Sequence, residues 1–232
     1  MAERARKVAI FDVDGTIFRS SLLIELVEML IENGDFPAEA QTEYAREYAA
    51  WLDREGEYES YIDAVVRTFR KHIKGLPYDA LKNAGQHMVA EHWKRTYRYS
   101  RDLLRDLKQR GYFLLAVSHS PKTVLDLFCP RLGFDKSYGI LYETGPQDRF
   151  TGVMLDEHLI LNKGAIAKRA VEKEGLTFEN SIGVGDTESD IPFLELVDEP
   201  ICFNPNLKLY KEAKRMGWQI KVERKDVIYD IE

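Results

Sequence analysis

Cysteine is scarce in this sequence of 232 residues, because Cys129 and Cys202 are the only two. Two cysteines cannot build a disulfide framework, although a single bridge stays possible, and cysteine-rich zinc sites are excluded. Hydrophobic residues make up 44% of the chain and charged residues 31%. This balance is ordinary for a globular protein, so disordered, collagen-like and low-complexity chains are excluded as well.

Long hydrophobic runs are also lacking. The longest candidate, from Leu22 to Ile31, is interrupted by Glu25 and Glu28, whereas a membrane span needs about 18 apolar residues. The basic start MAERARK is followed by only four apolar residues before Asp12, which is too short for a signal peptide. We therefore expect a cytoplasmic protein with no membrane partner.

An excess of basic residues is missing too. The 39 acidic and 33 basic residues give a net charge of −6, whereas proteins that bind phosphate backbones usually carry a positive excess. We expect no nucleic-acid partner. The length predicts about one and a half domains, which suggests one full domain with a smaller insert.

The first strand and a long helical stretch dominate the N-terminal half. The apolar run between Lys7 and Phe11 predicts a buried strand. Almost everything from Arg19 to Tyr97 has helical spacing. We predict four helices there: Leu22 to Leu30 after the caps Ser20 or Ser21, Pro37 through Trp51, Tyr58 to Ile73, and Tyr78 to Trp93.

Helices and strands alternate after Tyr97. The predicted helices are Arg101 to Arg110, Pro121 to Cys129 and Lys163 to Lys173. The predicted strands are Tyr112 to Val117, Tyr138 to Glu143, Phe150 to Leu155, Ser181 to Gly185, Pro200 to Phe203 and Trp218 to Val222. Such alternation predicts an α/β fold: a Rossmann-like, mainly parallel sheet with helices on both faces. We expect residues 1–18 and 98–232 to form this core domain, and residues 19–97 to form an all-helical insert after the first strand.

Polar side chains follow three of the predicted strands. They are Asp12 and Asp14, then Ser118, then Asp186 and Asp190, with Lys163 at the start of a helix. Because ligands bind beyond the carboxyl ends of parallel strands, we expect these groups to converge. Carboxylate oxygens favour Mg²⁺, while lysine, serine and backbone N–H groups suit a phosphate dianion.

The motifs in this order resemble those of the haloacid dehalogenase-like phosphohydrolases. They are DVDGT at 12–16, Ser118 at the end of YFLLAVS, Lys163 in NKGAIAKRAV, and Asp186 to Asp190 in GVGDTESDIPFL. The resemblance covers the chain from Val8 to about Trp218. The helical insert and the tail FNPNLKLYKEAKRMGW are similar to the phosphoserine phosphatase-like branch, in which the insert is a cap over the site.

The resemblance implies a mechanism. Asp12 would attack phosphorus and form an aspartyl-phosphate, while Asp14 would protonate the leaving alcohol and then activate water. Their two-residue spacing places both on one side of an extended chain. Mg²⁺ would bind the Asp12 and Asp186 carboxylates and the backbone carbonyl of Asp14, with support from Asp190.

Phosphate contacts are implied as well. Ser118 and Lys163 would hold phosphate oxygens, Gly15 would permit close backbone approach, and Thr16 would brace the loop. His119 stands where phosphoserine phosphatases usually carry glycine, and it either touches the substrate or lies at the rim of the pocket.

The resemblance implies a small-molecule phosphate ester as the substrate, selected by cap residues. The candidates are Arg19, Ser21, Glu25 and Arg67. Phosphoserine phosphatases use a cap glutamate shortly after the first motif and carry Ser-Gly-Gly in the second. Here Glu25 comes a full turn later and the second motif reads Ser-His-Ser, which argues against L-phosphoserine.

Other interpretations stay open at this point. The same site could serve a phosphotransferase or mutase, or a phospho-aspartate regulatory or binding protein without turnover. Ser118 could instead cap the following helix, Lys163 could be a solvated lysine, and Asp190 could only stabilise a first helical turn.

Overall fold

The computed structural model describes residues 5–157 and 161–231, and its centre is one sheet of eight strands in the order β4-β3-β2-β1-β5-β6-β7-β8. Strands β1, β2, β3, β5, β6 and β7 pair in parallel, and β4 and β8 are antiparallel to their neighbours. The bounds are β1 Arg6–Phe11, β2 Phe113–Pro121, β3 Lys136–Thr144, β4 Phe150–Leu155, β5 Leu176–Gly185, β6 Glu199–Phe203, β7 Gln219–Arg224 and β8 Val227–Ile231. The predicted α/β class is therefore confirmed.

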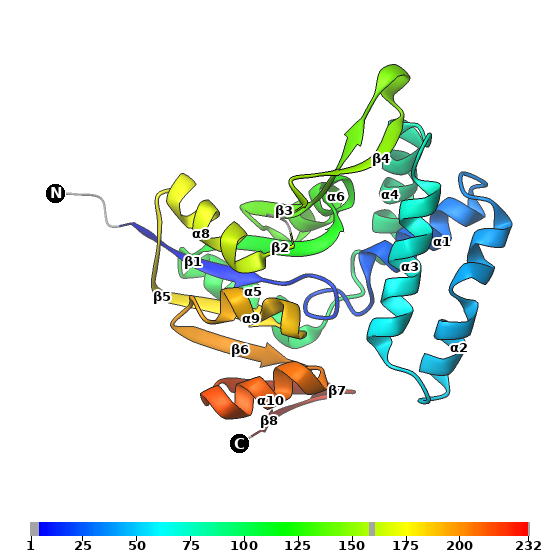
Figure 1. Cartoon of the computed structure of the whole chain (residues 1–232). Helices are drawn as coiled ribbons and strands as arrows, with labels where there is room; N and C mark the ends of the chain where they lie inside the picture. Colours follow the sequence, from blue (N-terminus) through cyan, green and yellow to red (C-terminus); the bar gives the residue numbers. More distant parts are fainter. Residues whose placement is uncertain (1–4, 158–160, 232) are drawn as a thin grey trace.

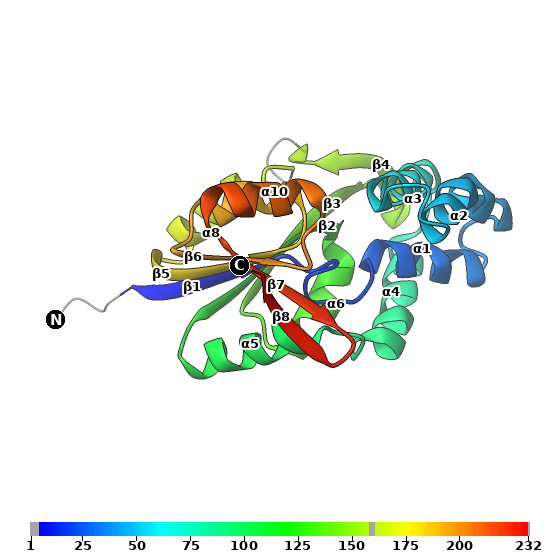
Figure 2. The ribbon, with the colours of Figure 1, turned by 90° about the horizontal axis from the view of Figure 1, so that it is seen from below.

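Helices cover both faces of the sheet (Figures 1 and 2). One face carries α5 (Arg98–Gln109) and α6 (Lys122–Leu132), and the other carries α8 (Lys163–Lys173), α9 (Ile191–Leu194) and α10 (Leu207–Met216). Side chains of β1 alternate between the faces: Ala9 and Phe11 belong to one hydrophobic cluster, Val8 and Ile10 to the other. This double burial explains why the strand has no polar residue between Lys7 and Asp12.

Four α-helices and a short 3₁₀ segment lie between β1 and α5. They are α1 (Leu22–Glu32), η1 (Ala38–Glu43), α2 (Ala45–Leu52), α3 (Tyr58–His72) and α4 (Tyr78–His92). The buried hydrophobic residues of α1, η1, α3 and α4 belong to the same cluster as the α5 and α6 face of the sheet, and Trp51 of α2 packs against it. The loop after α3 also pairs with the start of β4, where Gly75 N–H donates to the Phe150 carbonyl at 2.8 Å and Phe150 N–H to the Leu76 carbonyl at 2.9 Å.

Several predicted boundaries are wrong. The helix expected from Pro37 through Trp51 is divided into η1 and α2 at Tyr44, and α5 begins at Arg98 instead of Arg101. Strand β2 continues past Val117 to Pro121, and β5 begins at Leu176 rather than Ser181. Helix α10 and strand β8, which forms a hairpin with β7, were not predicted.

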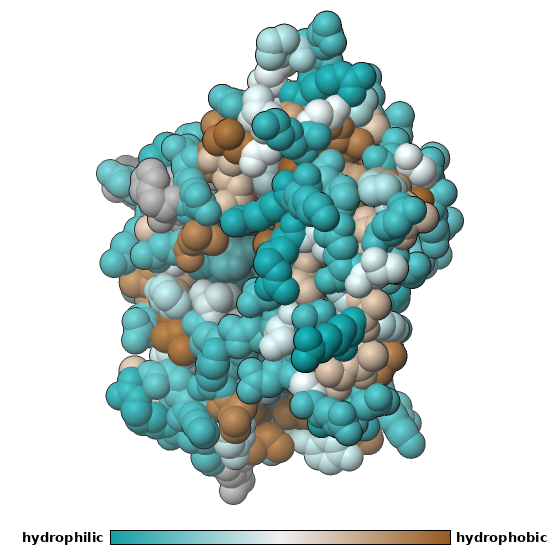
Figure 3. Space-filling model, turned by 45° about the vertical axis from the view of Figure 1, so that its right-hand side comes forward, coloured by the Kyte–Doolittle hydropathy of each residue, from teal (hydrophilic) through white to brown (hydrophobic). Residues whose placement is uncertain are grey.

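Cys129 and Cys202 are both buried and free, so the possible bridge does not form. The face in Figure 3 is mainly hydrophilic, with hydrophobic residues in small separate groups. No helix in the described parts of the chain is long and apolar enough to cross a bilayer.

Gly164, in the first turn of α8, gives the fold a testable contact. A Cβ there would lie 2.5 Å from the backbone carbonyl oxygen of Pro192 in α9. Alanine normally stabilises a helix by up to about 1 kcal/mol over glycine, but this overlap costs about 1–3 kcal/mol because the opposing atom is backbone. We expect Gly164→Ala to lower the free energy of unfolding in urea by about 1–2 kcal/mol. The exposed Lys168→Ala in the same helix is the control, with a change below about 0.5 kcal/mol. Unchanged or higher stability of Gly164→Ala would contradict the tight contact.

Candidate active site

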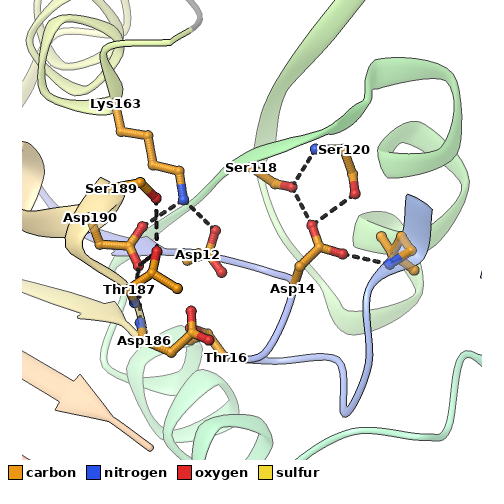
Figure 4. Close-up of polar contacts among 11 residues, drawn as sticks. Asp12, Asp14, Thr16, Ser118, Ser120, Lys163, Asp186, Thr187, Ser189 and Asp190 are labelled. Atoms are coloured by element: carbon orange, nitrogen blue, oxygen red, sulfur yellow. Dashed lines mark hydrogen bonds and ion pairs between the residues drawn. The ribbon is translucent and has the colours of Figure 1, made fainter. Parts of the chain in front are cut away.

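The carboxyl ends of three adjacent strands bring the predicted polar residues together (Figure 4). Strand β1 pairs in parallel with β2 on one side and with β5 on the other. Asp12 therefore lies between Ser118 in β2 and Asp186 after β5. The Asp12 N–H donates to the Val184 carbonyl at 2.9 Å, which continues the β1–β5 pairing up to the site.

Lys163 is the central cation of the site. Its Nζ lies 2.6 Å from Asp12 Oδ1 and 2.5 Å from Asp190 Oδ1, and all three residues are buried. The side chain of Asn162 caps α8 by accepting the Ala165 N–H at 3.0 Å, so the helix begins immediately at Lys163. The alternative of a solvated lysine is wrong, because the Lys163 side chain is only 3% exposed.

Burial shapes the acid–base properties of these groups. Loss of water raises the pKa of Asp12 to about 7, although the charge of Lys163 opposes the shift. The pKa of Asp186 lies well above its usual range, because of burial and because of the charges of Asp12 and Asp190. Burial would lower the pKa of Lys163, but Asp12 and Asp190 outweigh it and raise that pKa. The two carboxylates therefore favour the charged form of Lys163.

Asp190 holds the loop that follows β5. Its Oδ2 accepts the N–H groups of Asp186 at 2.9 Å and Thr187 at 3.0 Å, while its Oδ1 accepts Lys163. Asp190 thus lies in a short 3₁₀ turn, η3 (Glu188–Asp190), as part of a capping box with Thr187. The helical-turn interpretation is confirmed, and the support of a metal ion by Asp190 stays a prediction.

Carboxylate oxygens of Asp12, Asp186 and Asp190 all lie within 4.8 Å of one another. When ionised, these three carboxylates face one lysine, which leaves two unbalanced negative charges in a buried place. Hard oxygen ligands and a negative excess fit a divalent cation such as Mg²⁺.

Thr16 Oγ1 donates to Asp186 Oδ1 at 3.1 Å and orients the Asp186 carboxylate. A side chain at Gly15, which has φ of 80°, would collide with the Asp186 carboxylate.

Asp14 belongs to a different set of contacts. Its Oδ1 accepts the Leu22 N–H at 2.5 Å, and its Oδ2 accepts the hydroxyls of Ser118 at 2.6 Å and Ser120 at 2.8 Å (Figure 4). Its carboxylate therefore lies beside the carboxylate cluster but not in it. Only its backbone carbonyl stays a predicted metal ligand.

The structure rules out the alternative interpretation of Ser118 in the second motif. Ser118 does not cap a helix, because the N-cap of α6 is Pro121, which makes no side-chain capping bond. Ser118 is fully buried inside β2, and His119 is half-buried next to it. The phosphate contacts expected of both residues stay predictions.

The four substrate candidates lie in varied surroundings. Ser21 caps α1 by accepting the Leu23 N–H, and Glu25 pairs with Arg95 at 2.6 Å. Arg19 and Arg67 are exposed. Two of these side chains thus already serve structural contacts, while a role in substrate selection stays a prediction for all four.

One residue of the site, Ser120, was not predicted, and neither were the surroundings of Tyr58. Ser120 repeats the two-residue spacing of Asp12 and Asp14, so its alignment with Ser118 was readable from the sequence. Tyr58, the first residue of α3, carries no such signal. Its ring lies against Trp51 and Tyr61, and burial, with smaller contributions from the charges of Asp14 and Asp186, raises its pKa.

Comparisons with known proteins agree with this geometry. A family model described as haloacid dehalogenase-like hydrolase matches residues 9–195. A histidinol-phosphatase of Neisseria meningitidis serogroup C is 26% identical over 226 residues, which cover 93% of this chain and 98% of that protein.

Solved structures share the fold. A Bordetella pertussis protein of unknown function has a TM-score of 0.73 at 20% identity, covering 93% of this chain and 98% of its own. A phosphoserine phosphatase, as an analogue of its phospho-aspartyl intermediate, has a TM-score of 0.64 at 21% identity, covering 96% of both chains. Because the family model spans most of the sequence, the chain belongs to the haloacid dehalogenase-like hydrolases.

Proposed function

We propose that this protein is a Mg²⁺-dependent phosphatase that hydrolyses a small-molecule phosphomonoester through an aspartyl-phosphate on Asp12. The family and the phosphatases among its relatives make the chain a phosphoric monoester hydrolase. The observation that carries the finer proposal is the buried Asp12, held by Lys163 beside Asp14. This arrangement supports a nucleophilic role for Asp12 and an acid–base role for Asp14.

The first step transfers the phosphoryl group to the protein. A carboxylate oxygen of Asp12 attacks phosphorus, the bond from phosphorus to the ester oxygen breaks, and Asp14 gives its proton to that oxygen. Lys163 orients Asp12 and keeps a positive charge beside the incoming dianion. Ser118, the backbone N–H groups of the strand ends and Lys163 supply donors for the phosphate oxygens.

The second step hydrolyses the aspartyl-phosphate, and Asp14 now acts as the base. Asp14 takes a proton from water, the water oxygen attacks phosphorus, and the bond between phosphorus and Asp12 breaks. The products are inorganic phosphate and a free Asp12 carboxylate, with Asp14 protonated again for the next cycle. A bound Mg²⁺ would screen the repulsion between Asp12 and the phosphate, held by Asp12, Asp186, the Asp14 carbonyl and Asp190 directly or through water.

The helical segment 19–97 is proposed as a cap that excludes water and selects the substrate. Support comes from Lys208, whose Nζ bridges Glu59 in α3 at 2.9 Å and Glu188 beside the site at 2.5 Å. A phosphate-release screen over metabolites tests the function. L-histidinol phosphate and L-phosphoserine belong in it, since relatives carry those names. Release from at least one ester is expected, and none from any ester by magnesium-loaded, folded protein would contradict the proposal.

Asp12→Asn tests the nucleophile. We expect at least a 10³-fold loss of phosphate release, because an amide oxygen cannot form the acyl phosphate. The fold should persist, since the amide still accepts a hydrogen bond from Lys163, as circular dichroism and thermal unfolding would verify. Wild-type rates in this variant would refute the assignment.

A stable phospho-Asp12 in the wild-type protein that does not turn over would instead favour a phospho-aspartate regulatory protein.

Metal binding has a readout that is independent of turnover. In chelator, Asp12 has a pKa of about 7 in the folded protein against an ordinary 3.8, so its contribution to stability falls as pH rises through that interval. Mg²⁺ requires the ionised carboxylates, so we expect it to raise Tm more at pH 8 than at pH 6. At 100-fold excess over Kd the gain is about 2.7 kcal/mol. Asp186→Asn removes one ligand and should reduce the rise in Tm caused by Mg²⁺. A rise at pH 8 that is absent, or no larger than the rise at pH 6, would contradict the metal site.

A further inference from the structure

We propose that Ser120 is a positioning residue that holds the Asp14 carboxylate during catalysis while Ser118 turns to the phosphate. This inference rests on the proposed function, because it assigns the acid–base role to Asp14. It concerns the last residue of the Ser-His-Ser second motif, for which the sequence predicted no role. Its basis is the arrangement of two buried serines around one carboxylate oxygen (Figure 4).

The backbone of β2 explains why both serines face Asp14. Val117 pairs with Tyr138 and Pro121 pairs with Ile140, so four steps along β2 match only two along β3. The extra residues bulge between these pairs. Gly139 makes room for the bulge, because a Cβ there would lie 2.6 Å from the Ser120 carbonyl oxygen. Ser118 and Ser120 then both reach Asp14 Oδ2, at 2.6 Å and 2.8 Å.

The two hydroxyls are not equivalent. Ser118 Oγ accepts the Ser120 N–H at 2.9 Å and donates its only hydrogen to Asp14. A hydroxyl has one hydrogen, so Ser118 cannot donate to Asp14 and to a phosphate oxygen at once. When phosphate binds, Ser118 must release Asp14. The hydrogen of Ser120 stays on Asp14, and with the Leu22 N–H on Oδ1 it holds the carboxylate in place.

Because the two serines have different roles, their alanine variants should affect different measured quantities. Ser120→Ala leaves the phosphate contacts intact but loosens the general acid, whereas Ser118→Ala removes a phosphate donor. Protonation matters most for poor leaving groups, since 4-nitrophenolate departs without a proton. The loss caused by Ser120→Ala should therefore grow with the pKa of the leaving group.

The experiment uses a graded series of substituted phenyl phosphates with magnesium. We expect Ser120→Ala to lower kcat/KM about tenfold for phenyl phosphate, as for a lost hydrogen bond to a charged group, and no more than about twofold for 4-nitrophenyl phosphate. Ser137→Ala is the matched control. Ser137 is also a buried serine that donates to a carboxylate, Asp126, but it lies on β3 outside the site. Its removal should leave the series unchanged.

Binding of inorganic phosphate with magnesium, measured by calorimetry, gives a second readout without turnover. Ser118→Ala should weaken it about tenfold, and Ser120→Ala less than about threefold. A uniform loss across the ester series, or equal weakening of phosphate binding by both variants, would overturn the assignment of Ser120. If the wild-type protein binds phosphate but cleaves no ester, the proposed function fails, and the binding comparison still decides how the two serines divide their work.

Discussion

The site depends on one buried ammonium group shared by two carboxylates. A buried charge is costly unless it is paired, and removing one partner of such a pair costs about 3–5 kcal/mol. Lys163 meets this condition twice, with Asp12 and Asp190, and so ties α8 to the end of β1 and to the loop after β5. Its neighbour Gly164 lets α8 approach α9 closely enough to place the Lys163 side chain there.

The same contacts divide the site into two compartments. Asp12, Asp186 and Asp190 surround Lys163, where their excess negative charge suits a cation. Asp14, two residues from Asp12, is instead held by neutral donors: two serine hydroxyls and one backbone N–H. Adjacent carboxylates in unlike surroundings can take unlike roles. A carboxylate beside a lysine and a carboxylate beside hydroxyls therefore suit the two different roles proposed for Asp12 and Asp14.

The core of the fold was predictable because its signals are local. Strand β1 is an unbroken apolar run because it is buried on both faces, and α8 matches its prediction because Asn162 and Gly175 mark its ends. The polar residues at strand ends followed from the rule that parallel strands present their carboxyl ends together. Helix α10 and the β7–β8 hairpin were missed, and Tyr44 divides η1 from α2 without any proline or glycine to mark the break. The position of Tyr58 depends on how α3 packs against α1 and α2, which residue spacing does not encode.

Ser120 is an instructive middle case. Alternation along an extended strand places residues i and i+2 on one side, which pairs Ser118 with Ser120 as it pairs Asp12 with Asp14. Their common target, however, requires the bulge between β2 and β3, a tertiary feature that depends on Gly139 in another strand. A second motif defined by Ser118 alone therefore omits Ser120, whose hydroxyl also donates to Asp14.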